Sequence, residues 1–186
     1  MIKKDIIAAL ILFVSCAETI AQTDTPFVVF TQATIMNDKL AVYIPEQFTR
    51  VKKRTLKMNR PPVRLNEAIG YKHNDGSKAF FYRTDIAWNF TDKGIAIWDI
   101  AFKTAESFSS YQFIESGFFK EKINKSSTIY YLKILAIDNK KEVCALLTFS
   151  ELEGKILYGL YSSPANNYEV WDHASNEMLQ NQYVRS

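Results

Sequence analysis

The sequence predicts an α+β fold: a single antiparallel sheet of about six or seven strands, with a middle helix and a C-terminal helix packed on it. Three observations predict this class. The chain contains many short β-branched and aromatic runs bounded by turn residues. Three of these runs, at residues 128–137, 142–150 and 155–163, are joined by connections too short for a parallel crossover. Two other segments repeat apolar residues at helical spacing.

Residues 1–21 have the features of a targeting segment, and residues 22–186 those of a single domain. A positively charged start precedes an apolar run at 6–15, which is too short to span a bilayer. Two processing sites compete. Cys16 follows the apolar run as the lipidated cysteine of a bacterial lipoprotein does, whereas residues 19–21 suit ordinary signal peptidase cleavage. We expect an exported periplasmic or outer-membrane lipoprotein, or alternatively a secreted soluble protein.

The first half of the domain is expected to form paired strands. Residues 27–30 and 40–44 are apolar and β-branched, with polar turn residues between them. Residues 69–73 and 78–82 flank the sequence Asn-Asp-Gly at 74–76. Because these three residue types tolerate or prefer a positive φ, this pattern predicts a hairpin.

Two more strands and the middle helix are expected next. Residues 86–90 and 95–102 repeat the strand pattern around a turn at 91–94. From Thr104 the apolar period becomes helical, and Thr104 or Ser107 can cap the start of this helix. The residues expected on its faces are Phe108, Tyr111, Glu115 and Phe118, with Ile114, Phe119 and Ile123 beside them.

The last segment of the chain predicts the C-terminal helix. Pro164 ends the preceding strand, and Asn166 and Glu169 have the spacing of a capping pair. We expect this helix to lie across the sheet. The residues at helical spacing are Tyr168, Trp171, Ser175, Met178, Leu179 and Gln182.

The sequence contains no recognisable catalytic or metal-binding motif. His73 and His173 are distant in sequence, and no zinc, calcium, phosphate-loop or nucleophile-elbow pattern is present. Asp85 and Asp99 lie in or beside expected aromatic strands, where a buried carboxylate pair could serve acid–base catalysis and where solvent-facing positions are the simpler interpretation. Cys144 lies in an apolar run, and we expect an inert buried thiol. We therefore predict a protein that is not an enzyme and has no metal or cofactor.

The charge distribution is uneven. Seven basic residues occur with no acid between positions 48 and 66, although the net charge of the chain is only +3. Such a cluster can bind an acidic protein face or anionic lipid headgroups, or it can be a solvated loop that protects a sheet edge. Nucleic acid is not expected, because no aromatic residue is interleaved for stacking. The cluster consists of Arg50, Lys52, Lys53, Arg54, Lys57, Arg60 and Arg64.

Aromatic side chains are numerous, and most are expected in the core. Rings on a sheet face that no helix covers would instead form an exposed patch, which usually marks a partner site. A pocket between sheet and helix that holds a lipid or another apolar molecule is the alternative use of these rings.

Several segments resemble the PsbP-like superfamily, which includes DcrB/Eag-type proteins. The residues that carry the resemblance are 43–45, 142–150, 154–164, Tyr168, Trp171, Met178 and Leu179. The resemblance implies a middle helix before an antiparallel meander and a C-terminal helix over the sheet. It also implies a non-enzymatic role through protein partners, as in a photosystem accessory subunit, a Ran-binding import factor, envelope lipoproteins and chaperones of type VI secretion effectors.

From these features we expect an accessory protein of the cell envelope that binds a protein partner, within a secretion complex or another envelope complex. The basic cluster is the expected partner-binding surface, and Cys16 is the expected lipid anchor. The alternative function is a periplasmic protein that binds a small apolar ligand or a lipid.

Overall fold

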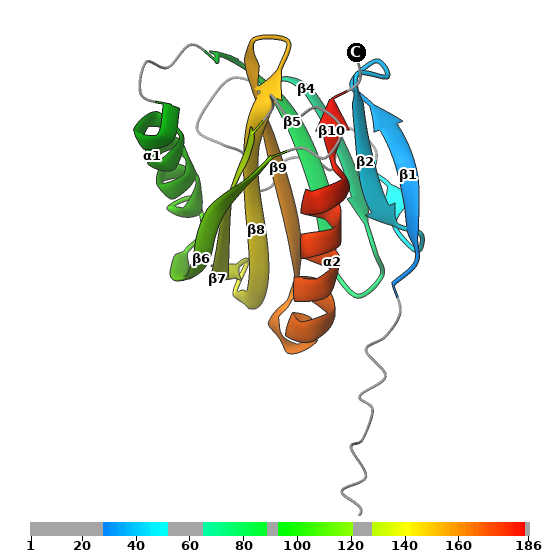
Figure 1. Cartoon of the computed structure of the whole chain (residues 1–186). Helices are drawn as coiled ribbons and strands as arrows, with labels where there is room; N and C mark the ends of the chain where they lie inside the picture. Colours follow the sequence, from blue (N-terminus) through cyan, green and yellow to red (C-terminus); the bar gives the residue numbers. More distant parts are fainter. Residues whose placement is uncertain (1–27, 52–64, 89–92, 121–127, 185–186) are drawn as a thin grey trace, which may run out of the picture.

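The computed structural model describes residues 28–51, 65–88, 93–120 and 128–184. Two helices and ten strands occur in these ranges, and the α+β class is confirmed. Figure 1 shows α1 on one side of a large twisted sheet and α2, with a smaller sheet, on the other. The elements are β1 (Phe30–Ile35), β2 (Leu40–Pro45), β3 (Thr49–Arg50), β4 (Leu65–Lys72), β5 (Lys78–Ala87), α1 (Lys93–Ala105), β6 (Ser110–Lys120), β7 (Thr128–Asp138), β8 (Lys141–Leu152), β9 (Lys155–Pro164), the short 3-10 helix η2 (Ala165–Asn167), α2 (Tyr168–Asn181) and β10 (Tyr183–Val184).

The large sheet has seven strands in the order β3-β4-β5-β9-β8-β7-β6, and all neighbouring pairs are antiparallel. The prediction of a single sheet needs correction, because β1, β2 and β10 form a second sheet of three strands. Five of the six β2 side chains are buried, mostly against α2 and one face of the large sheet. This burial holds β2 over the large sheet instead of at its edge.

Two hydrophobic cores cover the two faces of the large sheet. One core lies between the sheet, α2 and the small sheet, and Trp171 and Met178 of α2 belong to it. The other lies under α1, where Ile97, Ala101 and Ala105 pack against the opposite face of the sheet. The chain therefore forms three layers, with the large sheet in the middle (Figure 1).

The predicted meander is confirmed as β7, β8 and β9. Both of its hairpin turns have two residues, Asn139-Lys140 and Glu153-Gly154, and all four have a positive φ. Two-residue turns of this kind match the twist of antiparallel strands, and they fix the register of the meander. The hairpin at residues 74–76 is also confirmed as the β4–β5 turn, with Gly76 at φ 99°.

The strand predicted at 95–102 is wrong, because these residues lie in α1. Nearly every residue of the run is apolar, so alternation and helical spacing fit it equally well. The packing favours a helix, because Ile97, Ala101 and Ala105 are spaced four apart and are all fully buried against the sheet. The strand predicted at 86–90 is in part the end of β5, and residues 89–90 lie outside the described ranges.

The middle helix predicted from Thr104 to Ile123 is also wrong, because residues 110–120 form β6. The register of β6 against β7 shifts between Phe113 and Glu115, which marks a β-bulge. The bulge inserts one residue and breaks the alternation by which a strand is recognised. A side chain at Gly117 would displace the Tyr131 ring, because a Cβ there would lie 2.7 Å from the Tyr131 hydroxyl oxygen.

The C-terminal helix is confirmed as α2, which contacts β2, β9 and β8. The predicted capping pair is wrong: Asn167 occupies the N-cap position, and its side chain makes no capping hydrogen bond. In the part of the chain that is described, no helix is long and apolar enough to cross a membrane.

Candidate functional site

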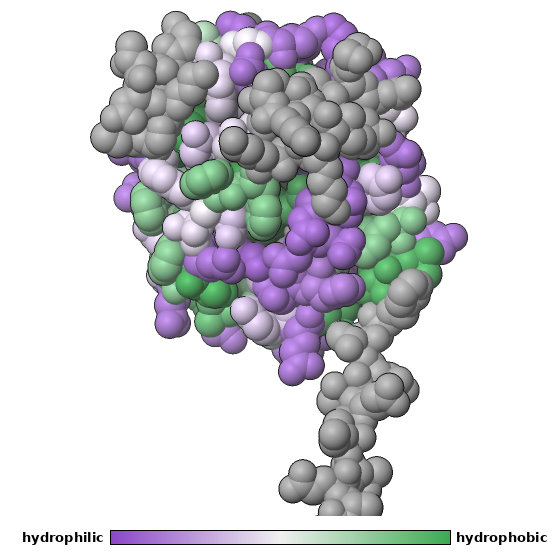
Figure 2. All heavy atoms as spheres, viewed as in Figure 1, coloured by the Kyte–Doolittle hydropathy of each residue, from purple (hydrophilic) through white to green (hydrophobic). Residues whose placement is uncertain are grey.

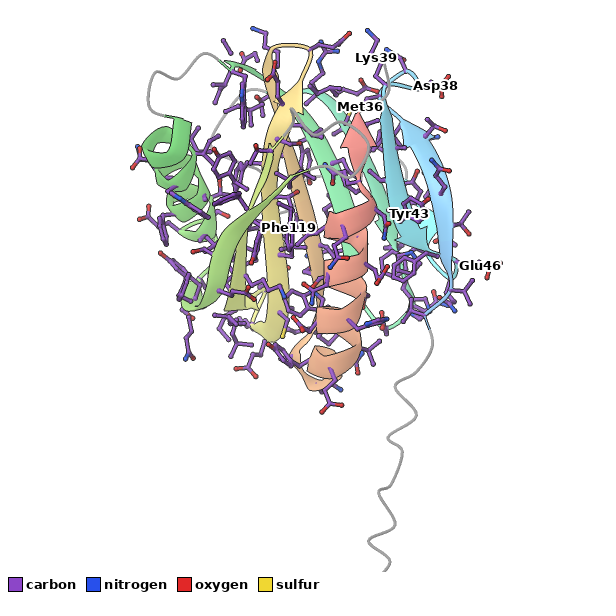
Figure 3. All side chains as sticks on the ribbon, viewed as in Figure 1. Met36, Asp38, Lys39, Tyr43, Glu46 and Phe119 are labelled. Carbon is purple, nitrogen blue, oxygen red and sulfur yellow. The ribbon has the colours of Figure 1, made fainter. Side chains whose placement is uncertain are left out.

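A pocket of about 280 Å³ opens between the β4–β5 turn, the end of β2 and the first turns of α2. Pro45 and Gln47 line it on either side of Glu46, which is labelled in Figure 3. The wall is mostly apolar, with a few polar groups from the turn. The lining residues used below are Phe48, His73, Asp75, Ser77, Tyr161 and Trp171.

A row of aromatic rings forms one side of this pocket. His73 stacks on Phe48 with their centroids 5.9 Å apart, and Phe48 lies 6.2 Å from Tyr161. Tyr161 in turn stacks on Trp171 at 6.3 Å, and Tyr168 lies 5.8 Å from Trp171. These contacts join the hairpin to the helix, so the walls of the pocket belong to one packed unit.

Asp75 is the acidic side chain of the pocket wall. Its Oδ1 accepts a hydrogen bond from the Ser77 backbone N–H at 2.7 Å and lies 3.0 Å from His73 Nδ1. Burial alone would raise the pKa of this carboxyl, but the hydrogen bonds from Ser77 and His73 outweigh burial and hold the pKa below its ordinary value. Asp75 Oδ2 has a single contact with Asn167 Nδ2, at the long distance of 3.5 Å, among the described residues.

The pocket also brings Ser163 of β9 next to three polar residues of the predicted 74–76 hairpin. His73, Asp75, Ser77 and Ser163 all line it. Ser77 Oγ donates to Ser163 Oγ at 3.0 Å, and in the described part of the chain no hydrogen bond joins either hydroxyl to His73. A nucleophilic serine needs a hydrogen bond to its base. The described contacts therefore form a carboxylate–histidine pair beside two serines that hydrogen-bond to each other.

The second candidate site is the edge strand β6. Within the described ranges β6 pairs with β7 alone, so its other side is an open edge of 11 residues. Phe113 is 50% exposed and Phe118 63% exposed. They pair with Ile134 and Tyr130, whose side chains belong to the core under α1, so both phenylalanines point to the α1 face.

Half-buried rings extend this surface towards α1. Tyr130 lies 6.3 Å from Phe118, 6.1 Å from Trp98 of α1 and 6.3 Å from Trp88. Figure 2 shows hydrophobic residues over this edge of the molecule, beside a hydrophilic band over α2. Phe119 points to the other face, where it stacks on Tyr131 (Figure 3). We call Trp88, Trp98, Phe113, Phe118 and Tyr130 the aromatic edge.

A buried charge lies on the α2 side of the same sheet. The Lys133 side chain is only 3% exposed, and its Nζ lies 2.6 Å from Asp172 Oδ1 and 3.5 Å from Glu115 Oε2. It also contacts Asn176 Oδ1 at 3.0 Å and lies over the Trp171 ring. Three of these partners, Trp171, Asp172 and Asn176, belong to α2, so the network fixes the helix on the sheet.

Most site residues predicted from sequence lie outside the described ranges, including Cys16 and the basic cluster from Lys52 to Arg64. Arg50, the first residue of that cluster, is exposed on β3, at the edge of the large sheet opposite β6. Asp85 is exposed on β5. Asp99 is exposed on α1, not on a strand, where it pairs with Lys103 at 2.8 Å.

The expectation of a buried Cys144 thiol is confirmed. The side chain is fully buried, and burial, assisted by the charges of Glu142 and Asp172, raises the pKa of the thiol to about 11. Since the thiolate is the reactive form, this cysteine is a packing residue. Among the described residues, no group of three or more His, Cys, Asp or Glu side chains is placed to hold a metal ion.

The comparisons with known proteins show which fold the chain has and do not show a family to which it belongs. No protein-family model matches the chain, and no curated protein matches it. Cyanobacterial PsbP (CyanoP) from Synechocystis sp. PCC 6803 is 12% identical, with a TM-score of 0.55 over 86% of this chain and 94% of that protein. PA94 from Pseudomonas aeruginosa, a protein of unknown function, is 10% identical, with a TM-score of 0.50 over 84% of this chain and 98% of that one. The chain therefore has a PsbP-like fold, as the sequence resemblance predicted.

Proposed function

We propose that this protein is a non-enzymatic accessory protein of the cell envelope that binds a protein partner through the aromatic edge. The observation that carries the proposal is the open side of β6 with its two exposed phenylalanines. Natural proteins normally protect such edges with charges, prolines or short strands. Between Ser110 and Phe119, β6 has 10 consecutive residues with no proline and no lysine, and its protection is limited to the bulge at Ile114 and the charge of Glu115, which lies on the α2 side.

The partner that fits this surface is an extended segment with apolar side chains. Such a segment can add an antiparallel strand to β6, with main-chain hydrogen bonds supplying affinity. Phe113 and Phe118 point to one face, so they would contact alternate apolar side chains of the added strand. Of the two edge strands of the large sheet, β6 offers the longer one for such an addition. It has 11 residues, whereas β3 at the opposite edge has two.

Photo-crosslinking in the protein's own cells tests this proposal. A benzophenone amino acid is placed at Phe113 or Phe118, with matched controls at Gln180 of α2 and Thr49 of β3, which are both exposed. We expect one heterologous adduct from both β6 positions and from neither control. A dimer of the chain itself would show that a second copy occupies the edge, and no adduct from either β6 position would also contradict the proposal.

We further propose that the protein is exported and anchored through Cys16, and that the basic cluster contributes to partner or membrane binding. The targeting segment and the run of seven basic residues support this part of the proposal. Labelling with a radioactive fatty acid should mark the wild type and not a Cys16→Ala variant. Charge reversal at Lys52, Lys53, Arg54 and Lys57 should weaken recovery of the crosslinked partner, and unchanged recovery would contradict a role for the cluster.

A second candidate function is binding of a small ligand, which the pocket beside α2 favours. Ligand sites are typically concave and mostly apolar, with a few convergent polar groups. The pocket has this composition, with Asp75 and Ser77 as polar groups among aromatic walls. Native mass spectrometry of protein purified from its own cells should then show a co-purifying small mass.

A further inference from the structure

We infer that the pocket beside α2 binds a small, mostly apolar molecule that carries one positive charge, with its cationic group at Asp75. This inference rests on the second candidate function, and it adds the chemical class of the ligand. The pocket volume of about 280 Å³ lies just below the usual range of small-molecule sites, so it suits a compact molecule.

The charge of the ligand follows from the acceptors of the pocket. Asp75 Oδ1 is already engaged by Ser77 and His73, whereas the contact that reaches Oδ2 from the described residues is the long one of 3.5 Å from Asn167 Nδ2. An ionised carboxylate has about four acceptor positions, so Oδ2 can accept a further donor. No lysine or arginine lines the pocket among the described residues. A cationic donor therefore matches the one carboxylate of the wall.

The apolar part of the ligand follows from the rest of the lining. Phe48, Tyr161 and Trp171 contribute aromatic surface, and Val170 and Ala174 contribute aliphatic surface from α2. Burial, and to a lesser extent the Asp75 charge, raise the pKa of the Tyr161 phenol, so Tyr161 stays uncharged. The Asp75 side chain is 36% exposed in the free protein, and the apolar part of a ligand that covers it would exclude water from the carboxylate and strengthen its interaction with a cation.

Three probes of matched size and different charge test the inference: benzylammonium, benzyl alcohol and benzoate. Binding is followed at pH 8, beyond the range in which histidines ordinarily titrate, through the NMR signals of the Trp171 indole N–H and the Ser77 amide. A charge-assisted hydrogen bond changes affinity by roughly tenfold or more. We expect benzylammonium to bind at least about tenfold more tightly than the alcohol, and benzoate to bind most weakly.

The variant Asp75→Asn keeps an oxygen that can accept the Ser77 hydrogen bond and removes the charge. It should weaken benzylammonium binding to the level of the alcohol, whereas Asp85→Asn, at an exposed position outside the pocket, should not. Equal binding of the charged and neutral probes would contradict the cation while leaving a ligand pocket. Preferred binding of benzoate would contradict it as well. If none of the three probes shifted the Trp171 and Ser77 signals, both the ligand class and the ligand-binding function would fail.

Discussion

Gly159 gives the sharpest test of the register at the centre of the large sheet. It lies on β9 between β5 and β8, directly opposite Thr148 of β8. A Cβ added at Gly159 would lie 2.2 Å from Thr148 Oγ1, whereas the next atoms, Thr148 Cβ and Phe81 Cδ1, would lie at the ordinary distances of 3.6 and 3.7 Å. The Thr148 hydroxyl oxygen is therefore the atom with which an alanine side chain at position 159 would clash.

The magnitude follows from this geometry. If Thr148 leaves its rotamer to make room, the cost is about 0.5–1.5 kcal/mol, and if strands must shift it is about 1–3 kcal/mol. Against this, alanine is favoured over glycine inside a strand by about 0.5–1 kcal/mol. After this gain is subtracted, we expect Gly159→Ala to lower the free energy of unfolding of the wild type by up to about 2.5 kcal/mol. In a Thr148→Ala background the same change should be neutral or stabilising by up to about 1 kcal/mol.

Urea denaturation followed by circular dichroism measures all four members of this double-mutant cycle. The predicted coupling between the two positions equals the cost of the clash, about 0.5–3 kcal/mol, with the second substitution rescuing the first. Equal destabilisation by Gly159→Ala in both backgrounds would refute the reasoning, because Thr148 would then not face Gly159.

Three further predictions concern Cys144, Lys133 and Asp75. With Cys16 replaced by serine, Cys144 should not react with a thiol reagent at pH 8 and should react fully in guanidinium, because burial raises its pKa to about 11; rapid reaction of the folded protein would contradict this. Asp172→Ala should lower the free energy of unfolding by roughly 3 kcal/mol more than Lys133→Met does. Asp172→Ala leaves the buried Lys133 ammonium without its nearest carboxylate, whereas Lys133→Met leaves two carboxylates that are partly exposed to water. The Asp75 carboxyl has a lowered pKa in the folded protein, so the ionised carboxylate stabilises the fold at pH values above its ordinary pKa of 3.8. This stabilisation is lost as the pH falls through the pKa of the folded state. The difference in unfolding free energy between the wild type and Asp75→Asn should therefore shrink in acid, and a constant difference would argue against the lowered pKa.

Local sequence patterns predicted the parts of the fold that local interactions determine. The meander and the 74–76 hairpin are confirmed because short turns with Asn, Asp and Gly restrict the pairing to neighbours. The exchange of helix and strand around residues 93–120 has a different cause. The 95–102 run is apolar except for Asp99, so its packing on the sheet is what selects a helix. The bulge at Ile114 removes the alternation that would identify β6.

The sites were less predictable than the fold, because their residues meet only through long-range pairing. His73 and Asp75 share a turn, and their proximity could have been inferred from the predicted hairpin. Ser163 and Trp171 reach the same pocket through β9 and α2, which no local pattern indicates. The aromatic edge was expected only conditionally, as a patch on an uncovered face. Its location depends on which strand is outermost, and that order comes from the pairing of β6 with β7.

Amide hydrogen exchange on the complex with the crosslinked partner tests the central claim most directly. The account predicts that amides of residues 110–120 that exchange quickly in the free protein become protected in the complex, because an added strand supplies their missing hydrogen-bond acceptors. Amides at Thr49 and Arg50, on the opposite edge, should exchange as before. Protection confined to that opposite edge, with β6 unchanged, would contradict the assignment of the aromatic edge as the binding surface.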